Sequence, residues 1–404
     1  MSTRAATKLM EFFQQQSVFS TKYSPLYQRL FGEVAGWLEK DPNGTVGKWL
    51  LDVSSERSEL ETSLLLMAGM HRDVLLRAPG TEDLSAYYPT VVGKDDALPV
   101  SDKKLGEIFR ATVEARRGSL VDMMQSGTVQ TNETARGIFW LLPTVLTGWK
   151  DVHVVDLGAS AGLNLVADQR RFTFVHPGEE SGSDQSVMDR SSLGLGGTDQ
   201  FEILCEPDVP HFWEGVHGAS IPSIHSRNGC DLNPFRLETE KDVATLKSFI
   251  WPDQLHRVAR LEEAIEARTA VVDKNHQPVS VYEANLPHDL PTFLRSLDLN
   301  NDCPAVIYNT YMTKYLENDG HALKSYIGDW ADETNRMVLW VQAEPPRFGM
   351  LEHPSNALHW CAWTVDLWQP QRTVKHLRWH IAWTHPHATT VEWLDGLDDF
   401  VRFF

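Results

Sequence analysis

The stretch VVDLGASAGLN, at residues 154–164, constrains the fold of this chain more than any other feature. An apolar run typical of a β-strand passes directly into a turn of small residues, and helical character follows over residues 160–169. Glycine allows a ligand to approach the backbone closely, and the first turn of a helix has unpaired N–H groups. This order predicts an α/β sheet with a ligand site at the carboxyl end of the strand.

Hydrophobic periodicity divides the chain into two regions near residue 150. In the first region, the run LYQRLFGEVAGWLEK places apolar residues at helical spacing, and Ser58 with Glu61 has the spacing of a capping box. Residues 1–147 are therefore predicted to form a helical region that caps a second domain.

In the second region, short β-branched or aromatic runs alternate with helical stretches, which predicts a mostly parallel sheet covered on both faces. About eight residues join the last two runs, too few for a crossover helix, so these two strands should pair antiparallel. Residues 148–404 are thus predicted to form a Rossmann-like α/β domain of seven strands, with a Ser/Gly-rich surface insertion at residues 177–200. The strand runs are 152–158, 223–233, 279–285, 305–311, 337–344, 358–368 and 376–385, and the helical stretches are 160–169, 239–268, 289–298 and 320–335.

The turn after the first strand departs from the dinucleotide fingerprint G-x-G-x-x-G, because Ser160 replaces the glycine that makes room for a pyrophosphate. The pattern suits a ligand without pyrophosphate, such as S-adenosylmethionine. Gly158, Ser160, Gly162 and Asn164 would face the methionine part of that ligand. Asp156 would order the loop or bind the ligand's ammonium group. The rival interpretation is a tight strand–helix turn that binds nothing.

Each of the next three predicted strands also ends on polar residues. A carboxylate at the end of the second strand, here Asp231, can accept hydrogen bonds from both ribose hydroxyls. The end of the third strand could hold the adenine amino group, and the end of the fourth would lie near the reacting part of the ligand. Turn formation and core packing are the alternative roles of all these positions. The candidates on the third and fourth strands are Glu283, Asn285, Asn309, Tyr311 and Tyr315.

Two motifs of the helical region provide further candidates for ligand contact. In QTNETAR, Gln130, Asn132 and Arg136 are predicted to lie over the cofactor, with Arg136 as the partner of its carboxylate. A helix N-cap within this motif is an alternative that is compatible with the same role. In YSPLY, the rings of Tyr23 and Tyr27 could face the sulfonium through cation–π attraction, with core packing as the alternative.

Six motifs spread over most of the chain support a family resemblance. They are SPLYQRL (24–30), QTNETAR (130–136), GASAGLNL (158–165), RNGCDLNP (227–234), WPDQLHR (251–257) and YNTYMTKYL (308–316). On these motifs the chain resembles an uncharacterised bacterial family defined as a domain of unknown function. Residues 152–384 are similar to a class I S-adenosylmethionine-dependent methyltransferase, including the closing antiparallel pair. The resemblance implies a methyltransferase-like fold and leaves the substrate open.

The expected reaction is attack by a small-molecule acceptor on a carbon bound to the sulfonium sulfur, usually the methyl carbon. Because the sulfonium is already an activated leaving group, proximity and in-line alignment would provide most of the catalysis. A base is needed only for an acceptor that arrives protonated, and Tyr311, Glu344 and Glu133 are the candidates. Attack on another sulfonium carbon would give aminocarboxypropyl transfer or cyclisation, with release of methylthioadenosine. Ligand binding without catalysis is a further possibility.

An α/β-hydrolase is the remaining alternative, because residues 158–162 also match the nucleophile elbow G-x-S-x-G with Ser160 as nucleophile. The order of the later strands and the placement of Asp231 at a strand end favour the transferase. Histidines that could complete a catalytic triad are His353, His359, His385 and His387.

Charge and cysteine usage narrow the possible partners. With 37 Lys and Arg against 55 Asp and Glu, the net charge of −18 disfavours a nucleic-acid partner. The chain has no C-x-x-C pair and no H-E-x-x-H motif, so no metal site is expected. The N-terminal segment is not of signal-peptide type, and no run reaches the roughly 18 apolar residues of a membrane span. These observations predict a cytoplasmic protein without a membrane partner, and they leave the oligomeric state open.

Overall fold

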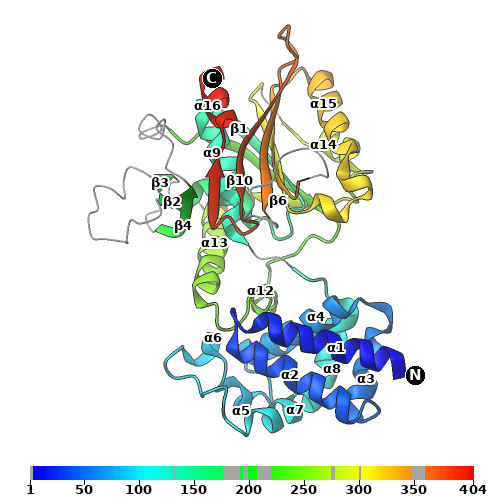
Figure 1. Ribbon diagram of the computed structural model, residues 1–404. Helices are drawn as coiled ribbons and strands as arrows, with labels where there is room; N and C mark the ends of the chain where they lie inside the picture. Colours follow the sequence, from blue (N-terminus) through cyan, green and yellow to red (C-terminus); the bar gives the residue numbers. More distant parts are fainter. Residues whose placement is uncertain are drawn as a thin grey trace. The chain divides into compact units, whose positions relative to one another are not determined.

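The computed structural model describes residues 3–130, 133–175, 192–193, 199–206, 220–273, 278–299, 302–346 and 360–404 (Figure 1). Contacts divide the chain into two compact units. The helical unit comprises Met1–Asn132 and Arg236–Leu261, and the sheet unit comprises Glu133–Phe235 and Glu262–Phe404. Residues 133–147, predicted to belong to the N-terminal helical region, lie in the sheet unit, and residues 236–261, predicted to belong to the second domain, lie in the helical unit.

The core of the helical unit is built from the apolar faces of its helices. The apolar positions of the predicted LYQRLFGEVAGWLEK helix, Leu26, Leu30 and Val34, are fully buried. The predicted capping box is confirmed, because the side chains of Ser58 and Glu61 each accept a hydrogen bond from the other residue's backbone. The helices are α1 (Thr3–Ser20), α2 (Pro25–Lys40), α3 (Thr45–Val53), α4 (Glu59–Leu75), α5 (Glu82–Ser85), α6 (Pro89–Val92), α7 (Leu105–Ala115), α8 (Arg117–Ser126) and α12 (Glu240–Ser248), with the 3-10 helix η1 (Ser54–Glu56).

The sheet unit is an α/β fold. Its strands are β1 (Asp151–Leu157), β2 (Arg171–Val175), β3 (Ser192–Leu193), β4 (Asp199–Glu206), β5 (Ser223–Asp231), β6 (Val279–Glu283), β7 (Ala305–Thr310), β8 (Val338–Glu344), β9 (Cys361–Trp368), β10 (His376–Thr384) and β11 (Thr390–Trp393). Its helices are η2 (Thr134–Gly137), α9 (Ile138–Leu146), η3 (Leu163–Gln169), α14 (Leu290–Ser296), η4 (Thr313–Tyr315), η5 (Glu317–Gly320), α15 (Ala322–Thr334) and α16 (Asp395–Phe403), while the unit boundary falls within α13 (Leu255–Asp273).

The centre of the sheet is doubly wound. Strands β1, β5, β6, β7 and β8 are parallel to their neighbours in this group, and they lie in the spatial order β6-β5-β1-β7-β8. Numbered along the chain, this is the order 3-2-1-4-5, in which the connections turn to opposite sides after the first strand. The topological switch point therefore lies between β1 and β7, where ligands bind in open α/β sheets.

The far side of the sheet is larger than predicted. Strand β9 pairs antiparallel with β8 and with β10, which confirms the predicted antiparallel pair. The prediction of seven strands was too low, because β11, β4, β2 and β3 continue the described strands into one 11-stranded sheet. Within the predicted insertion at 177–200, β3 and the first residues of β4 belong to this sheet, and the other positions lie outside the described residues.

Alternating side chains of the central strands pack on the two faces of the sheet. Val154 and Tyr308 belong to the apolar cluster that contains α9, whereas Val155 and Ile307 belong to the cluster that contains α14 and α15. Figure 1 shows α14 and α15 together on one side of the sheet. Both faces of the central strands are thus covered, as in other parallel sheets, and polar side chains can reach solvent chiefly at the strand ends.

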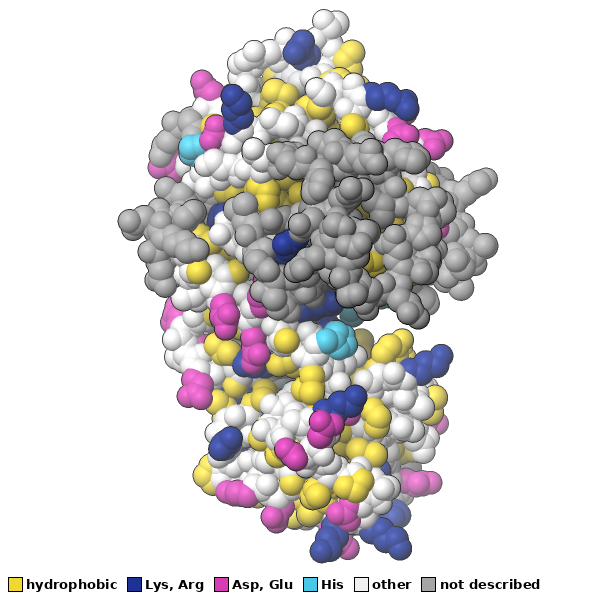
Figure 2. Space-filling model, turned by 90° about the vertical axis from the view of Figure 1, so that its left-hand side faces the viewer, with side chains coloured by type: hydrophobic (Ala, Val, Ile, Leu, Met, Phe, Trp, Pro, Cys, Tyr) yellow, Lys and Arg dark blue, Asp and Glu magenta, His cyan; other side chains and the backbone are white. Residues whose placement is uncertain are grey.

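Exposed charges of both signs occur together on the protein. In the space-filling view, Lys and Arg side chains lie among Asp and Glu side chains (Figure 2). Among the helices of the described residues, none is both long enough and apolar enough to span a membrane.

Candidate functional site

The turn after β1 has a left-handed backbone at three of its positions. Gly158, Ser160 and Gly162 all have positive φ values, of 90°, 48° and 70°. A side chain on Gly162 would place its Cβ 2.6 Å from a methyl carbon of Val279 on β6, so the turn requires glycine here. The N–H groups of Gly158 and Ala159 donate to the Cys230 carbonyl at 2.8 and 3.0 Å, which fixes the turn against β5.

Asp231 joins the end of β5 to this turn. One carboxylate oxygen accepts a hydrogen bond from the Ser160 N–H at 2.9 Å, and the other accepts one from the Asn233 N–H at 2.9 Å. Asp231 is half-exposed, and its register partner on β6 is Glu283. The structure therefore brings together the predicted residues at the ends of β1, β5 and β6, which form what we call the carboxyl edge of the sheet.

Asp156, the last polar residue of β1, is buried beneath the turn. Its carboxylate accepts a hydrogen bond of 2.6 Å from the hydroxyl of Tyr308, whose ring stacks on Trp140 of α9. The pKa of Asp156 is raised to about 7, chiefly by burial and also by the nearby charge of Asp231, while the Tyr308 hydrogen bond and Arg136 act in the opposite direction. Near neutral pH this carboxyl group is therefore poised between its neutral and charged forms.

The predicted segment QTNETAR reaches the same edge through its last residues. Glu133 is buried, and its carboxylate lies 3.1 Å from Nδ1 of His387. Arg136 is also buried; its Nε donates to the Pro386 carbonyl at 2.8 Å, and its guanidinium lies 5.2 Å from the ring centre of Tyr311. Burial lowers the pKa of Arg136, whereas Glu133 and other acidic neighbours raise it.

Asn164, just beyond the turn, is attached to this segment. Its side-chain amide donates to the Glu133 carbonyl at 3.3 Å, and its own carbonyl accepts a hydrogen bond of 2.8 Å from the indole of Trp140. Among the described residues, its buried side-chain oxygen has no hydrogen-bond partner. A buried polar atom without a partner is costly, so this oxygen is available to a ligand donor.

Glu344, at the end of β8, holds the backbone that follows β7. Its buried carboxylate accepts hydrogen bonds from the side chains of Asn309 and Thr313 at 2.7 and 2.9 Å, and from the Met312 and Thr313 N–H groups at 3.0 and 3.1 Å. Burial raises the pKa of Glu344, and these hydrogen bonds lower it. Because donors surround the carboxylate, its evident role is to anchor this segment.

Tyr311 lies between two cations in the segment that Glu344 anchors. Its φ is 54°, and its ring centre is 4.1 Å from the ammonium of Lys314, in addition to the Arg136 contact. Tyr315 is 74% exposed, and its ring faces the same Lys314 ammonium at 4.7 Å. The Tyr311 ring thus makes cation–π contacts with both Arg136 and Lys314 at the carboxyl edge.

The remaining predicted residues are those at and beyond the end of β6, together with several that lie elsewhere. Glu283 is the exposed last residue of β6, beside Asp231. Asn285 is also exposed, and its N–H donates to the Asp289 carboxylate at 2.7 Å. Gln130 and the two tyrosines belong to the helical unit. There Tyr27 is buried, with its hydroxyl 3.3 Å from the Met67 carbonyl. Tyr23 is half-exposed against Trp251. Asn132, His353 and His359 lie outside the described residues.

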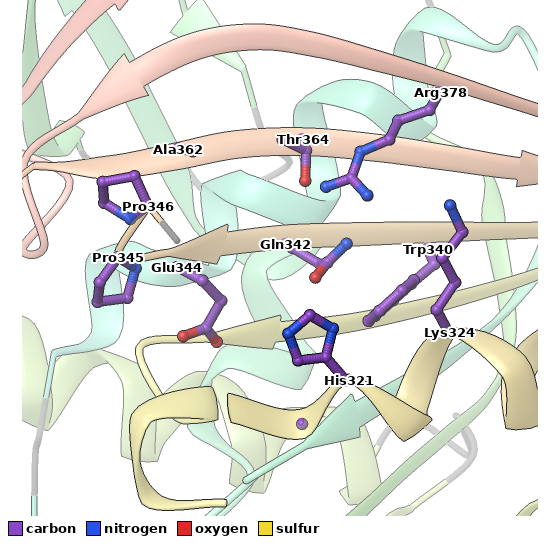
Figure 3. A pocket seen from close by; sticks show the side chains of 11 residues that line it. His321, Lys324, Trp340, Gln342, Glu344, Pro345, Pro346, Ala362, Thr364 and Arg378 are labelled. Carbon is purple, nitrogen blue, oxygen red and sulfur yellow. The ribbon is translucent and has the colours of Figure 1, made fainter. Parts of the chain in front are cut away.

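A small polar pocket beside Glu344 was missed by the sequence analysis. It has a volume of about 100 Å³ and lies over β8, β9 and β10, with Gln342, Thr364 and Arg378 extending into it from the strands (Figure 3). The buried Asp366 carboxylate accepts a hydrogen bond from Gln342 at 3.3 Å and lies 2.7 Å from Nε2 of His376. The sequence does indicate polar positions in these strands. Gln342 interrupts the apolar run VLWVQAE, and Thr364 and Asp366 interrupt CAWTVDLW.

Comparisons with known proteins identify the family of the chain and nothing narrower. The family model described as "Uncharacterized protein conserved in bacteria (DUF2332)" matches residues 10–393. No curated protein and no solved structure matched the chain.

Proposed function

The chain belongs to the bacterial family DUF2332, and from this premise we propose that its sheet unit binds S-adenosylmethionine at the carboxyl edge. It would transfer a carbon group from the sulfonium to a small-molecule acceptor. The single observation that supports this most is the turn Gly158–Gly162, which has three positive φ values and lies at the topological switch point of a doubly wound sheet.

Each part of the cofactor has a matching group at this edge. A carboxylate has about four acceptor positions, so Asp231 keeps capacity for the ribose hydroxyls beyond the N–H groups of Ser160 and Asn233. The unpartnered side-chain oxygen of Asn164 can accept a hydrogen bond from the ligand's ammonium. Arg136 can pair with the ligand's carboxylate, as in other guanidinium–carboxylate pairs.

In the proposed reaction, a lone pair of the acceptor attacks the methyl carbon as the carbon–sulfur bond breaks. The bonding electron pair passes to sulfur, and S-adenosylhomocysteine leaves. An acceptor that arrives protonated must lose a proton, and Tyr311 and Glu133 are the candidate bases that would accept it. Glu344, the third predicted base, accepts hydrogen bonds from surrounding donors and therefore anchors the backbone in this scheme. Attack on the aminocarboxypropyl carbon would release methylthioadenosine instead.

The test measures binding and products separately. Calorimetric titration with S-adenosylmethionine should show one site per chain, and mass spectrometry after incubation with acceptor pools should show S-adenosylhomocysteine. Methylthioadenosine would assign aminocarboxypropyl transfer or cyclisation. Binding without either product would indicate a ligand-binding protein, and no binding at millimolar ligand would contradict the proposal.

Asp231→Asn tests the ribose contact, with Asp329→Asn, an exposed carboxyl on α15, as the matched control. A hydrogen bond to a charged group contributes about 1.5–3 kcal/mol, so Asp231→Asn should weaken S-adenosylmethionine binding by roughly 10- to 150-fold. Asp329→Asn should bind as the wild type does. An unchanged dissociation constant in Asp231→Asn would remove this residue from the site.

Serine hydrolysis is a second candidate, because Ser160 has the positive φ of 48° within a G-x-S-x-G turn. Two observations oppose it. A 3-10 helix follows the turn, and the Asp231 carboxylate lies 2.9 Å from the Ser160 N–H, where negative charge would disfavour a developing oxyanion. A fluorophosphonate adduct on Ser160 that disappears in Ser160→Ala would favour the hydrolase over the transferase.

A further inference from the structure

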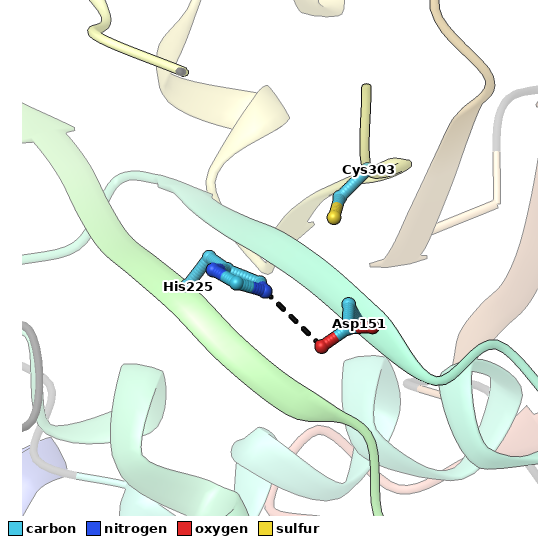
Figure 4. A group of neighbouring side chains, drawn as sticks. All are labelled: Asp151, His225 and Cys303. Atoms are coloured by element: carbon cyan, nitrogen blue, oxygen red, sulfur yellow. Dashed lines mark hydrogen bonds and ion pairs between the residues drawn. The ribbon is translucent and has the colours of Figure 1, made fainter. Parts of the chain in front are cut away.

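The opposite edge of the sheet unit brings together three side chains of metal-ligand type. Asp151 is the first residue of β1, His225 lies near the start of β5, and Cys303 precedes β7 by two positions. Strands β7, β1 and β5 are neighbours in the sheet, so residues far apart in the sequence become adjacent. Figure 4 shows the three side chains facing a common space.

Their separations are close to those of a metal site. Nε2 of His225 lies 3.1 Å from a carboxylate oxygen of Asp151. One ligand atom from each of the three residues lies within 4.8 Å of the other two. Zinc bonds of 2.0–2.3 Å in a tetrahedron require ligand separations of about 3.3–3.8 Å. Shifts of the side-chain atoms by about 1 Å give these separations. The side chains of Asp151 and His225 are 45% and 40% exposed, which leaves them room to move.

A β-bulge places His225 in this group. Val152 pairs with Ile224 and His153 pairs with Ser226, so His225 is the extra residue on β5. Bulges re-aim side chains, and this one turns the His225 ring toward Asp151 and to within 5.9 Å of the His153 ring. The bulge is an observation independent of the distances, and it favours a built arrangement over a chance contact.

Cys303 is held in place by its backbone. Arg336 donates hydrogen bonds to the Cys303 carbonyl and, at 3.1 Å, to the Leu299 carbonyl. Cys205, Cys230 and Cys361 are buried in the core, whereas Cys303 is only partly buried. Burial and the charges of Asp151 and Asp302 raise the pKa of the Cys303 thiol, and Arg336 lowers it. Bound metal would displace the thiol proton.

We propose that Asp151, His225 and Cys303 bind one zinc ion at the amino edge of the sheet. Thiolate, imidazole and carboxylate together suit zinc, which is borderline soft, better than magnesium or calcium. Three protein ligands leave one position for water. The ion ties the starts of β5, β1 and the segment before β7 to one another, so it stabilises the sheet unit at the edge opposite the proposed cofactor site.

The experiment uses the full chain after removal of metals with a chelator. Zinc titration should give about one ion per chain, and zinc should raise the melting temperature. Substitution with cobalt(II) should give the charge-transfer absorption band of a thiolate–cobalt bond. Cys303→Ser should abolish the band, and His225→Ala and Asp151→Asn should weaken zinc binding at least 10-fold, since loss of even outer-shell partners costs that much.

Two controls separate ligation from other effects. His288→Ala removes another exposed histidine of the same unit, and Asp302→Asn removes a carboxylate next to Cys303 that is not a ligand. Both should keep the cobalt band and bind zinc within a few-fold of the wild type. A band that persists in Cys303→Ser, or equal zinc affinity in wild type and His225→Ala, would overturn the proposal. Circular dichroism verifies that each variant is folded.

Discussion

At the residue scale, the carboxyl group of Asp156 determines how the carboxyl edge responds to pH. Its pKa is about 7 in the folded chain, above that of an ordinary aspartate, because it is buried beside Tyr308. The folded state therefore binds a proton more tightly than the unfolded state does. The stability that this proton contributes is present at pH 4 and is lost as the pH rises through 7.

Asp156→Asn should remove this pH dependence. Between pH 4 and 7 the wild type should lose stability relative to the variant, measured as the free energy of unfolding in urea at each pH. Asp398→Asn, an exposed carboxyl on α16, is the control and should follow the wild-type profile. Parallel profiles for wild type and Asp156→Asn would contradict the raised pKa.

At the element scale, the turn after β1 depends on the absence of a side chain at Gly162. Its φ is 70°, and a Cβ would lie 2.6 and 3.1 Å from methyl carbons of Val279 and Val281 on β6. Gly148, in the same unit, has a φ of 65°, but no heavy atom of the described residues lies within 4 Å of an added Cβ. The two positions therefore share the backbone cost of an L-residue and differ in the steric contact.

Gly148→Ala should destabilise the chain by about 1–2 kcal/mol, the cost of a left-handed L-residue. Gly162→Ala should cost a further 1–3 kcal/mol or so from overpacking against β6, and it should also weaken S-adenosylmethionine binding. Urea denaturation measures the difference. Equal losses in the two variants would show that β6 gives way and that the turn tolerates a side chain.

Sequence periodicity predicted the central strands well because they are buried on both faces and are rich in β-branched residues. It missed β2, β3, β4 and β11. The run at 171–175 follows a short 3-10 helix with no turn signal, and β11 has only 4 residues. β3 and the start of β4 fall within the segment 177–200, whose Ser/Gly-rich composition is typical of a loop. The stretch 239–268 was predicted as one helix, but the structure has two, α12 and α13.

The candidate site was predictable in part for a related reason. Residues at consecutive strand ends meet at one edge of a parallel sheet, so Asp156, Asp231 and Asn309 could be found from strand order alone. The zinc ligands could not, because the sequence analysis expected no metal site in the absence of a spaced motif. Their proximity depends on the spatial order of β7, β1 and β5 and on the bulge at His225.

At the scale of the whole molecule, each unit has its own hydrophobic core, and the segment 236–261 closes the helical one from a distant part of the chain. His71 on α4 contacts both α12, which lies in that segment, and α6. Its Nδ1 lies 3.3 Å from the Ser248 carbonyl, and its Nε2 lies 2.8 Å from the Thr90 hydroxyl. The imidazole thus connects α12 to α4, and its burial favours the neutral ring over the charged one.

Burial lowers the pKa of His71 to about 4, so the unfolded chain binds a proton between pH 6.5 and 4 that the folded chain does not. The wild type should therefore lose up to about 3 kcal/mol of stability as the pH falls through this range. His71→Gln should show a shallower loss in urea denaturation, whereas His288→Gln, at an exposed histidine, should keep the wild-type slope. Should the variant fail to fold, an NMR titration of the wild type measures the pKa of His71 directly. A value near 6.5 would contradict the prediction that burial keeps this imidazole neutral.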